Sequence, residues 1–340
     1  MKLSELHSSP SRAVVHLACS RGGHLDLLLR HQEAFEGCRV VWVTQHSARA
    51  EQLRRGGADV HVLGEWHRSA RWITAAGMMI WRSLGLVLRQ RPHVVVTSGS
   101  GIVVPFCLMA RLTGARLVFV ETAARVCGPS SSGRVLSRIA HDVIAQWDDM
   151  QAVYPHATVS RTSVVEDLAA SPRIDGTGTL VVVGTHSQPF DRLLRMVDRA
   201  AESGILPEPI TAQVGPSRQR VRGAELRDLI SPEEMERRIV AARHVVCHAG
   251  TGTISTALRA GRRPLVLARS ARHEEHFDDH QQQIVDRLAA LDLVVPLGDQ
   301  ITRGDLARAA RPLRLPPELE RLPLLVDCLR DRVHRARACA

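Results

Sequence analysis

Short apolar runs rich in β-branched residues alternate along the chain with longer stretches in which apolar positions recur every three or four residues. The short runs predict buried strands, and the longer stretches predict amphipathic helices. In the first half the predicted strands are Ala13 to Ala18, Val40 to Val43, Val60 to Leu63, Val94 to Thr97, Leu117 to Val120 and Val143 to Ala145. Strands that alternate with helices indicate a parallel, doubly wound sheet.

The pattern restarts after Ser171 to Gly178, a break rich in proline, glycine, aspartate and threonine. Such a composition is typical of a linker. Further apolar runs then predict strands at Leu180 to Val183, Ile210 to Val214, His244 to Cys247, Leu265 to Ala268 and Leu293 to Pro296, followed by two terminal helices. We therefore expect an α/β protein with two Rossmann-like domains, residues 1–172 and 173–340.

The composition narrows the classes of protein to which the chain can belong. Its 340 residues suffice for two domains with full cores, and 44% hydrophobic and 24% charged residues are usual for a globular protein. Seven scattered cysteines without metal spacing favour a reducing cytosol. The polar start argues against secretion, and no apolar run is long enough to span a membrane. The net charge of +10 favours an anionic partner, such as nucleic acid, a nucleotide diphosphate or an acidic membrane surface.

A glycine-rich turn in the second half, from His248 to Gly252, separates a predicted strand from a helix. Backbone N–H groups in the first turn of a helix have no partner within the helix, and they favour an anionic ligand, typically a nucleotide phosphate. Glycine-rich turns also occur for packing alone, so this turn leaves both interpretations open.

A dense polar segment, Glu274 to Gln283, follows the next predicted strand. Because neighbouring parallel strands end at one edge of a sheet, we expect this segment and the glycine-rich turn to face the same crevice. His273, His276 and His280 with nearby carboxylates raise the alternative of a metal site. Their spacing differs from that of helical zinc proteases, and we favour hydrogen bonding over metal binding.

Two features of the first half end at predicted strands. Gly22 and Gly23 form a turn before a helix, where backbone can approach a diphosphate closely, and His24 can accept a proton near neutral pH. Glu121 ends a buried strand and could orient a substrate or serve as a base. The alternatives are a plain strand–helix turn for the first feature and an ion pair of Glu121 with Arg125 for the second.

These segments resemble glycosyltransferase family 28. The motif His-Ala-Gly-Thr-Gly-Thr from His248, together with Glu-His-Phe-Asp-Asp-His-Gln from Glu275, is similar to the catalytic subunit of the dolichol-pathway N-acetylglucosaminyltransferase and its bacterial exopolysaccharide relatives. The run from Val183 to Asp191 resembles the first strand and loop of that subunit. The first half resembles the acceptor-side, membrane-associated subunit, but it lacks the hydrophobic helix with which that subunit usually begins. The whole chain thus resembles both subunits fused in acceptor-then-donor order.

The resemblance implies a GT-B fold, in which two Rossmann-like domains face across a cleft and a terminal helix can cross back to the first domain. It implies an inverting transferase that moves a sugar, N-acetylglucosamine or a related hexose or uronic acid, from a UDP-sugar to a polyprenyl-diphosphate-linked sugar without a metal or other cofactor. His24 is the expected base and Glu121 the alternative. Expected acceptor-binding residues are Gly22, Gly23, Ser98, Gly99, Ser100, Gly101 and Arg125. Expected donor-binding residues are Gly184, Thr185, His186, His248, Gly250, Thr251, Gly252, Thr253, Glu275, Asp279, His280, Gln281 and Gln282.

Tryptophans and arginines between Trp66 and Arg91 suit a membrane interface, although most of the apolar surface there fits a core helix. We therefore expect a cytoplasmic protein bound peripherally to the inner face of the membrane. Three other functions stay open: a UDP-sugar 2-epimerase, a glycosyltransferase of a soluble natural product, and a nucleic-acid binder. The last is disfavoured because the arginines are spread out and few aromatic residues accompany them.

Overall fold

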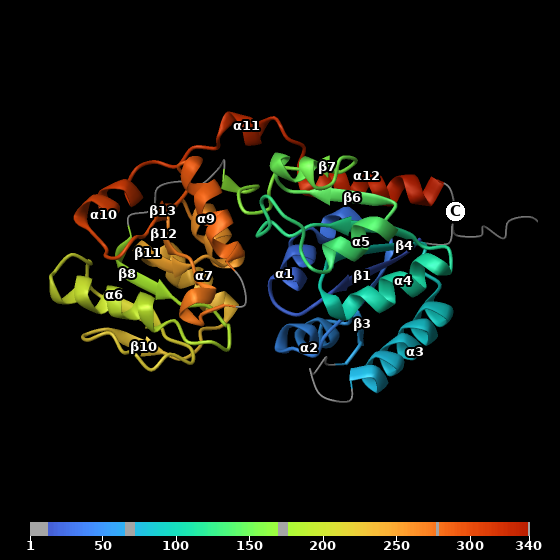
Figure 1. The fold of residues 1–340 in the computed structure, drawn as a ribbon, viewed down its shortest axis with the longest axis horizontal. Helices are drawn as coiled ribbons and strands as arrows, with labels where there is room; N and C mark the ends of the chain where they lie inside the picture. The colour runs from blue at the N-terminus through green and yellow to red at the C-terminus, as the bar shows by residue number, and fades with distance from the viewer. Residues whose placement is uncertain (1–12, 65–71, 169–175, 277–278, 339–340) are drawn as a thin grey trace, which may run out of the picture. The chain divides into compact units, whose positions relative to one another are not determined.

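The computed structural model describes residues 13–64, 72–168, 176–276 and 279–338. The described chain divides into two compact units. Unit 1 comprises Met1–Thr122, Pro129–Ser160 and Pro323–Ala340, and unit 2 comprises Ala123–Gly128 and Arg161–Leu322. Each unit is built on one parallel sheet, as the alternation of strands and helices predicted (Figure 1).

The sheet of unit 1 has the strand order β3-β2-β1-β4-β5-β6-β7, and every pair of adjacent strands in it is parallel. Its strands are β1 (Val14–Cys19), β2 (Arg39–Thr44), β3 (Asp59–Val62), β4 (Val94–Gly99), β5 (Arg116–Val120), β6 (Asp142–Ala145) and β7 (Thr158–Val159). Its helices are α1 (Gly23–Arg30), α2 (Ala48–Arg55), α3 (Trp72–Gln90), α4 (Val104–Leu112), α5 (Gly133–Ile139) and α12 (Leu325–Ala338), with the 3₁₀ helices η1 (Gln32–Phe35), η2 (Gly101–Val103) and η3 (Asp148–Ala152).

One face of this sheet is covered by helices from both ends of the sequence. Leu25 and Leu28 of α1 pack with Val15 and Leu17 of β1, since residues three apart share one face of a helix. The C-terminal helix α12 buries Leu325, Cys328, Leu329, Val333 and Ala336 in the same core. Figure 1 shows α12 beside β7, where Arg332 Nη2 donates a 2.6 Å hydrogen bond to Thr158 Oγ1.

The position of α12 corrects the expected domain boundary. The division into residues 1–172 and 173–340 assigned the C-terminal helix to the second domain, whereas it belongs to unit 1 because its apolar stripe completes that core. The long segment of unit 2 also begins earlier than residue 173, at Arg161, whose Nε and Nη2 donate to the carbonyl oxygens of Leu319 and Glu320.

The sheet of unit 2 has the strand order β10-β9-β8-β11-β12-β13, again fully parallel. Its strands are β8 (Thr177–Val182), β9 (Ile210–Gln213), β10 (Glu225–Arg227), β11 (Ala242–His248), β12 (Leu265–Leu267) and β13 (Val295–Pro296). Its helices are α6 (Asp191–Glu202), α7 (Pro232–Ala241), α8 (Thr251–Arg259), α9 (His280–Ala290), α10 (Arg303–Ala309) and α11 (Pro317–Glu320), with the 3₁₀ helix η5 (Ala271–His273).

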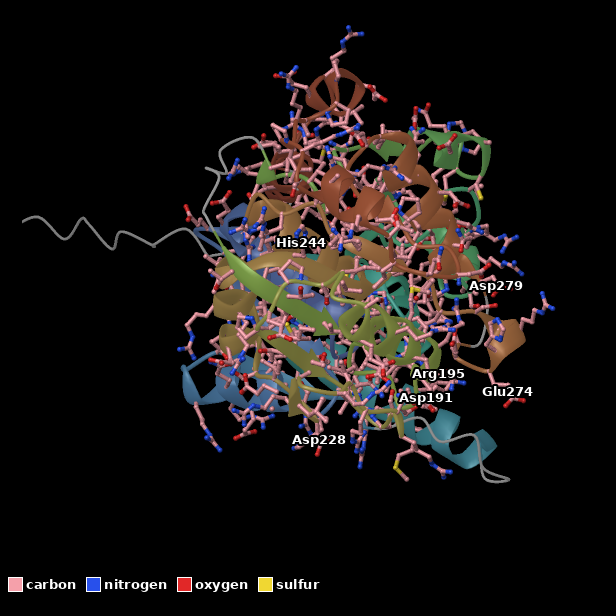
Figure 2. The ribbon with its side chains drawn as sticks, turned by 90° about the vertical axis from the view of Figure 1, so that its left-hand side faces the viewer. Asp191, Arg195, Asp228, His244, Glu274 and Asp279 are labelled. Atoms are coloured by element: carbon pink, nitrogen blue, oxygen red, sulfur yellow. The ribbon has the colours of Figure 1, made fainter. Side chains whose placement is uncertain are left out.

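The order of unit 2 places β8 next to β11, and β11 next to β12. Because these strands are parallel, the segments that follow them emerge at one edge of the sheet. Figure 2 shows Asp191, Glu274 and Asp279 on one side of the unit, away from His244, which lies near the start of β11. The segments that follow β8, β11 and β12, which carry the predicted donor-binding residues, therefore begin at the carboxyl edge of this sheet.

Candidate functional site

The ring of His248 occupies the space between two glycine turns of unit 2. Its Nδ1 lies 3.4 Å from the carbonyl oxygen of Val182, at the end of β8. A Cβ atom added at Gly250 would lie 2.2 Å from Nε2 of this ring, and one added at Gly184 would lie 2.5 Å from it. Burial, assisted by the nearby charge of Arg269, lowers the pKa of His248 to about 4, so the ring is neutral at pH 7.

The three glycines of the donor loops thus have different roles. Gly184 and Gly250 must lack a side chain because the imidazole fills that volume, and Gly184 also has a φ of 85°. Gly252 lies inside α8, and a Cβ there would meet no atom within 4 Å. No side chain caps α8 at Gly250, so the N–H groups of its first turn, which carries Thr251 and Thr253, suit an anionic ligand.

A buried arginine that the sequence analysis did not single out ties the donor loops together. Arg269 is 1% exposed and lies two residues after the end of β12. Its guanidinium donates to the carbonyl oxygens of Val183 at 2.8 Å, Gln188 at 2.9 Å and Glu275 at 3.1 Å, and it stacks on Phe190 with 4.6 Å to the ring centroid. Burial lowers its pKa to about 10, which leaves it cationic at pH 7.

Two residues expected to bind the donor are instead bonded within the protein. Both carboxylate oxygens of Glu275 pair with Arg192, at 3.1 and 2.7 Å, and one of them also accepts from the backbone N–H of Ser270. Gln281 Oε1 accepts from the backbone N–H of Arg269 at 3.0 Å. Glu275 is 5% exposed and Gln281 is 7% exposed, so both hold the loop in shape.

The other predicted donor residues after β12 are more open. Asp279 is exposed, and its Oδ1 accepts from the backbone N–H of Ala271 at 2.8 Å. Gln282 is exposed and donates from Nε2 to Asp286 Oδ1 at 2.8 Å. His280 is half-buried at the start of α9. Thr185 is exposed directly after Gly184.

His186, predicted from the loop after β8, contacts His276 from the loop after β12. Their ring centroids lie 5.1 Å apart, and the rings of His276 and His280 lie 4.8 Å apart. Within the described part of the chain, no group of three or more His, Cys, Asp or Glu residues has an arrangement that could hold a metal ion. The metal-independent donor site stays a prediction.

In unit 1, His24 lies in the first turn of α1, as expected from the Gly22-Gly23-His24 motif. Gly22 precedes the helix with φ 78° and ψ −140°, a conformation that glycine alone adopts readily. Ser98 Oγ donates to the carbonyl oxygen of His24 at 3.2 Å. Desolvation lowers the pKa of the His24 imidazole, against smaller raising effects of a hydrogen bond to the Ser98 backbone and of the Glu121 charge. A neutral imidazole at pH 7 can accept a proton.

Glu121 has its carboxylate surrounded by donors and is 1% exposed. Oε1 accepts from the backbone N–H of Thr122 at 2.9 Å, and Oε2 accepts from Tyr154 Oη at 2.8 Å and from the backbone N–H of Ser130 at 3.1 Å. A Cβ at Gly133 would lie 2.3 Å from Oε2, so the start of α5 packs directly on the carboxylate. These bonds connect the end of β5 at Glu121 to the segment that contains Ser130 and to Tyr154.

The network continues from Glu121 to the predicted acceptor loop. Ser130 Oγ lies 3.4 Å from Ser132 Oγ, which accepts from the backbone N–H of Ser100 at 2.9 Å. Ser100 has φ 92°, which is rare for a residue with a side chain, and Gly99 has φ 93°. The loop from Ser98 to Gly101 is thereby held in an unusual conformation by a chain of hydrogen bonds that ends at Glu121.

One predicted acceptor residue lies in the other unit, and three residues that surround Glu121 and the Ser100 loop were not predicted. Arg125 lies in the segment Ala123–Gly128, which belongs to unit 2. Ser130, Ser132 and Tyr154 were not predicted, although the run Ser130-Ser131-Ser132-Gly133 at a helix start was a visible signal. Tyr154 is the single tyrosine of the chain, and its role follows only from the fold.

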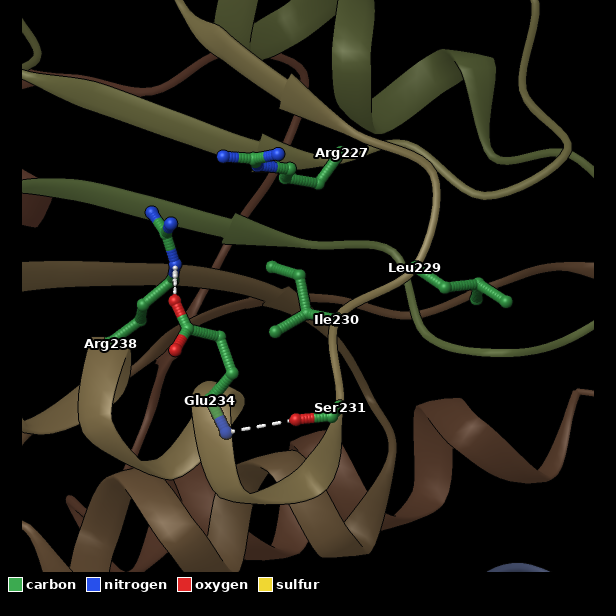
Figure 3. A pocket seen from close by; sticks show the side chains of 6 residues that line it. All are labelled: Arg227, Leu229, Ile230, Ser231, Glu234 and Arg238. Carbon is green, nitrogen blue, oxygen red and sulfur yellow. Dashed lines mark hydrogen bonds and ion pairs between the residues drawn. The ribbon is translucent and has the colours of Figure 1, made fainter. Parts of the chain in front are cut away.

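A pocket of about 310 Å³ in unit 2 lies apart from these groups, between β10 and α7 (Figure 3). Its charged side chains neutralise one another: Arg238 bonds Glu234 and Glu225, and Arg227 bonds Glu225. The lining residues are Arg227, Leu229, Ile230, Ser231, Glu234 and Arg238, which include none of the predicted site residues.

The segment between Trp66 and Arg91, which was expected to contact a membrane, is only partly described. Trp66 and the side chain of Trp72 lie outside the described residues, as does Arg71. Trp81 on α3 is 76% exposed, and Leu112 on the neighbouring α4 is 70% exposed. None of the described helices has the length and hydropathy that crossing a membrane requires.

Comparisons with known families cover both halves of the chain. Residues 67–162 match the family described as oligosaccharide biosynthesis protein Alg14 like, and residues 179–296 match the glycosyltransferase family 28 C-terminal domain. The first match contains Glu121, Ser130 and Tyr154, and the second contains the His248 turn and Arg269.

Individual proteins show the same two likenesses. The UDP-N-acetylglucosamine–N-acetylmuramyl-(pentapeptide) pyrophosphoryl-undecaprenol N-acetylglucosamine transferase of Cupriavidus pinatubonensis is 25% identical over 336 residues, covering 90% of each chain. The UDP-N-acetylglucosamine transferase subunit ALG14 of Mus musculus is 37% identical over 82 residues, which are 22% of this chain and 38% of that subunit.

The crystal structure of MurG from Acinetobacter baumannii superposes with a TM-score of 0.64 at 16% identity, covering 95% of this chain and 99% of MurG. That likeness concerns the fold, while the two family matches concern the sequence. The chain joins an Alg14-like segment to a family 28 C-terminal domain, and it is a glycosyltransferase of the family 28 type with the GT-B fold.

Proposed function

We propose that the protein transfers a sugar, N-acetylglucosamine or a related hexose or uronic acid, from a UDP-sugar to a sugar on a polyprenyl diphosphate. The observation that carries this proposal is the turn around His248, where two glycine loops pack on the His248 ring beside the uncapped start of α8. Free N–H groups at a helix start suit a diphosphate. The bacterial relative of nearly equal length is named for the transfer of N-acetylglucosamine to a pyrophosphoryl-undecaprenol acceptor, which supports the same substrate classes here.

Unit 2 holds the donor in this proposal. The diphosphate lies against Gly184, Thr185 and the first turn of α8, whose N–H groups and dipole favour negative charge. That charge grows as the bond between the sugar and the diphosphate breaks, so these groups stabilise the transition state more than the ground state. Arg269 fixes the loop after β8 and the loop after β12 by donating hydrogen bonds to their carbonyl oxygens. The proposal requires no metal ion.

Unit 1 supplies the base and the acceptor loop. His24 is the base because its pKa is lowered, which keeps the imidazole neutral and able to accept the proton of the attacking hydroxyl. Glu121 is a positioning residue, since its oxygens are already engaged by backbone N–H groups and by Tyr154. Through Ser130 and Ser132 it holds the loop at Ser100, which we assign to the acceptor diphosphate. Attack from the face opposite the leaving group gives an inverted, β-linked product.

The acceptor's lipid requires contact with a membrane surface, and α3 and α4 offer a suitable face. Met78, Trp81 and Leu88 recur at helical spacing on α3 and are 56%, 76% and 56% exposed. Leu108 and Leu112 of α4 are 38% and 70% exposed. Exposed arginines flank this face, at positions Arg82, Arg89 and Arg111. Tryptophan with apolar and cationic neighbours suits the interface of an anionic bilayer, which supports our proposal that the protein binds peripherally to the inner face of the cytoplasmic membrane.

The test is a transfer assay with a panel of UDP-sugars, a polyprenyl-diphosphate-linked sugar and mass spectrometry of the lipid fraction. We expect a disaccharide on the lipid with one preferred donor and unchanged activity in the presence of a chelator. Loss of activity on chelation with recovery by a divalent ion would contradict the metal-free donor site. A UDP-sugar with the configuration at C2 inverted, formed without acceptor, would identify a 2-epimerase. Glycosylation of a soluble acceptor alone would identify a natural-product transferase.

A further inference from the structure

Three histidine rings meet at the carboxyl edge of the sheet of unit 2. His186 follows β8, His276 follows β12, and His280 is the first residue of α9. His276 is central, since its ring centroid lies 5.1 Å from that of His186 and 4.8 Å from that of His280. We call these three residues the histidine stack. The mechanism above uses none of their rings as a proton carrier.

The stack lies within electrostatic reach of the proposed diphosphate surface. His186 and His276 both act on the pKa of His248, whose ring fills the space between Gly184 and Gly250. His186 itself is only two residues beyond Gly184. A diphosphate on this turn would therefore lie close to at least one ring of the stack.

The charged groups around the stack come from several elements. The cationic Arg269, after β12, is committed to backbone carbonyl oxygens, and Arg192 of α6 is committed to Glu275. Asp279, which precedes α9, accepts a backbone hydrogen bond. Burial, His276 and Arg269, in that order, lower the pKa of His186, so without an anionic ligand its protonated form is disfavoured near pH 7.

We propose that the histidine stack takes up a proton when the diphosphate of the donor binds, and that the resulting imidazolium neutralises the leaving diphosphate. The bond between the anomeric carbon and the β-phosphate oxygen breaks, and its electron pair stays on that oxygen. The acceptor oxygen forms the new bond and its proton passes to His24. The stack keeps its own proton throughout as a hydrogen-bond donor to the phosphate. This inference rests on the proposed donor site.

The geometry explains why one proton, and not three, is taken up. Two imidazolium rings about 5 Å apart repel each other strongly, so the stack holds one charge at a time. A bound anionic phosphate offsets the free-energy cost of placing that single positive charge in the stack. A fixed cation at this place would also bind the anion, but it would not release the spent nucleotide more readily as the pH rises.

The experiment is titration calorimetry of the full chain with UDP-N-acetylglucosamine in the absence of acceptor. Both phosphates of this donor are fully ionised near neutral pH, so any proton taken up binds to the protein. Measurement in two buffers of different ionisation enthalpy gives the number of protons. We expect uptake of roughly half to one proton at pH 7, and an affinity that falls at higher pH by at most about tenfold per pH unit, the limit for one linked proton.

The variant His276→Gln removes the central ring and keeps a hydrogen-bonding side chain of similar length. It should bind the donor with less proton uptake and with a weaker pH dependence than the unmodified protein, because it removes the ring that contacts the other two. The matched control is His273→Gln, because His273 is exposed in η5 and should leave the uptake unchanged. A thermal melt verifies that each variant is folded, and His186→Gln replaces His276→Gln if the latter does not fold.

The outcomes separate this inference from the proposed function. Donor binding without proton uptake in the unmodified protein overturns the inference and leaves the donor site intact. Uptake that survives when all three residues of the stack are replaced by glutamine also overturns it, because a group outside the stack then takes the proton. Failure of the folded, unmodified protein to bind UDP-N-acetylglucosamine at any pH overturns the donor site and the inference together.

Discussion

Replacement of Gly250 by alanine tests whether the two glycine turns of unit 2 are built around the His248 ring. The added Cβ would lie 2.2 Å from Nε2 and 2.7 Å from Cε1 of that ring, closer than such atoms approach in proteins. Neither the ring nor the turn can move without cost, since Nδ1 is held near Val182 and Gly184 closes the other side. The variant should therefore displace the imidazole and distort the start of α8.

The expected magnitude follows from the kind of clash. Overpacking of a close-packed site typically costs about 1–3 kcal/mol. For a unit of this size that corresponds to a fall in melting temperature of about 2–12 °C. Gly184→Ala should cost more, because its Cβ would lie 2.5 Å from the ring and its φ of 85° adds about 1–2 kcal/mol of backbone strain. Gly252→Ala meets no atom and should be neutral or raise helix stability by up to about 1 kcal/mol.

The assay is thermal unfolding of each alanine variant in the native background and in the His248→Ala background. Without the ring, Gly250→Ala should cost almost nothing, while Gly184→Ala should retain its strain of about 1–2 kcal/mol. Donor binding should fall in Gly250→Ala and persist in Gly252→Ala. Equal losses of stability for Gly250→Ala in both backgrounds would refute the steric role of His248.

Three further outcomes are expected. In His24→Ala, turnover should fall by about 10²–10⁴, and the decline of the rate at acid pH that reports protonation of the base should vanish. Glu121→Gln should keep this decline but shift it to lower pH, because the charge of Glu121 raises the pKa of His24. If the decline vanishes in Glu121→Gln instead, Glu121 is the base. In flotation with anionic vesicles, Trp81→Ser should weaken binding several-fold while Leu229→Ser, 67% exposed on unit 2, should not; equal effects would reject the α3 face. Burial lowers the pKa of His16 to about 4 from 6.5, so the unfolded state binds its proton first as the pH falls. This group should contribute about 3 kcal/mol to the loss of stability between pH 6.5 and 4, and His16→Leu should reduce the loss in denaturant titrations by about that amount; an unchanged loss would contradict the reasoning.

The sequence predicted the architecture well because parallel strands buried on both faces leave a strong apolar signal. The runs at Val94 to Thr97 and at His244 to Cys247 lie within β4 and β11. Two strands escaped prediction: β7 has two residues and β10 has three exposed residues, so neither carries an apolar run. The unit to which α12 belongs was also not fixed by its local pattern, since an amphipathic helix does not indicate which core its apolar stripe completes.

The candidate site was predicted as far as strand ends allow. His24, Glu121 and His248 follow or end predicted strands, and parallel topology brings such positions to one edge of each sheet. The partners of these residues could not be predicted, because they come from distant segments. Arg269 looked like one of many arginines, yet it binds carbonyl oxygens 80 or more positions away in sequence, at Val183 and Gln188.

Because partners from other segments cannot be read from the sequence, the positions at strand ends identified important residues but not the interactions that these residues make. Glu121 and Glu275 are carboxylates at carboxyl edges, the position at which α/β proteins hold ligands, and both were expected to meet substrate. Each proves to be almost fully buried and surrounded by donors. Glu121 accepts from the backbone N–H groups of Thr122 and Ser130 and from Tyr154, and Glu275 accepts from the backbone N–H of Ser270 and from Arg192. A buried carboxylate without such donors would be costly, so these bonds are a condition of its burial. Once these bonds are made, the carboxylate fixes the shape of the loop that it holds, and a direct contact of Glu121 or Glu275 with substrate stays a prediction.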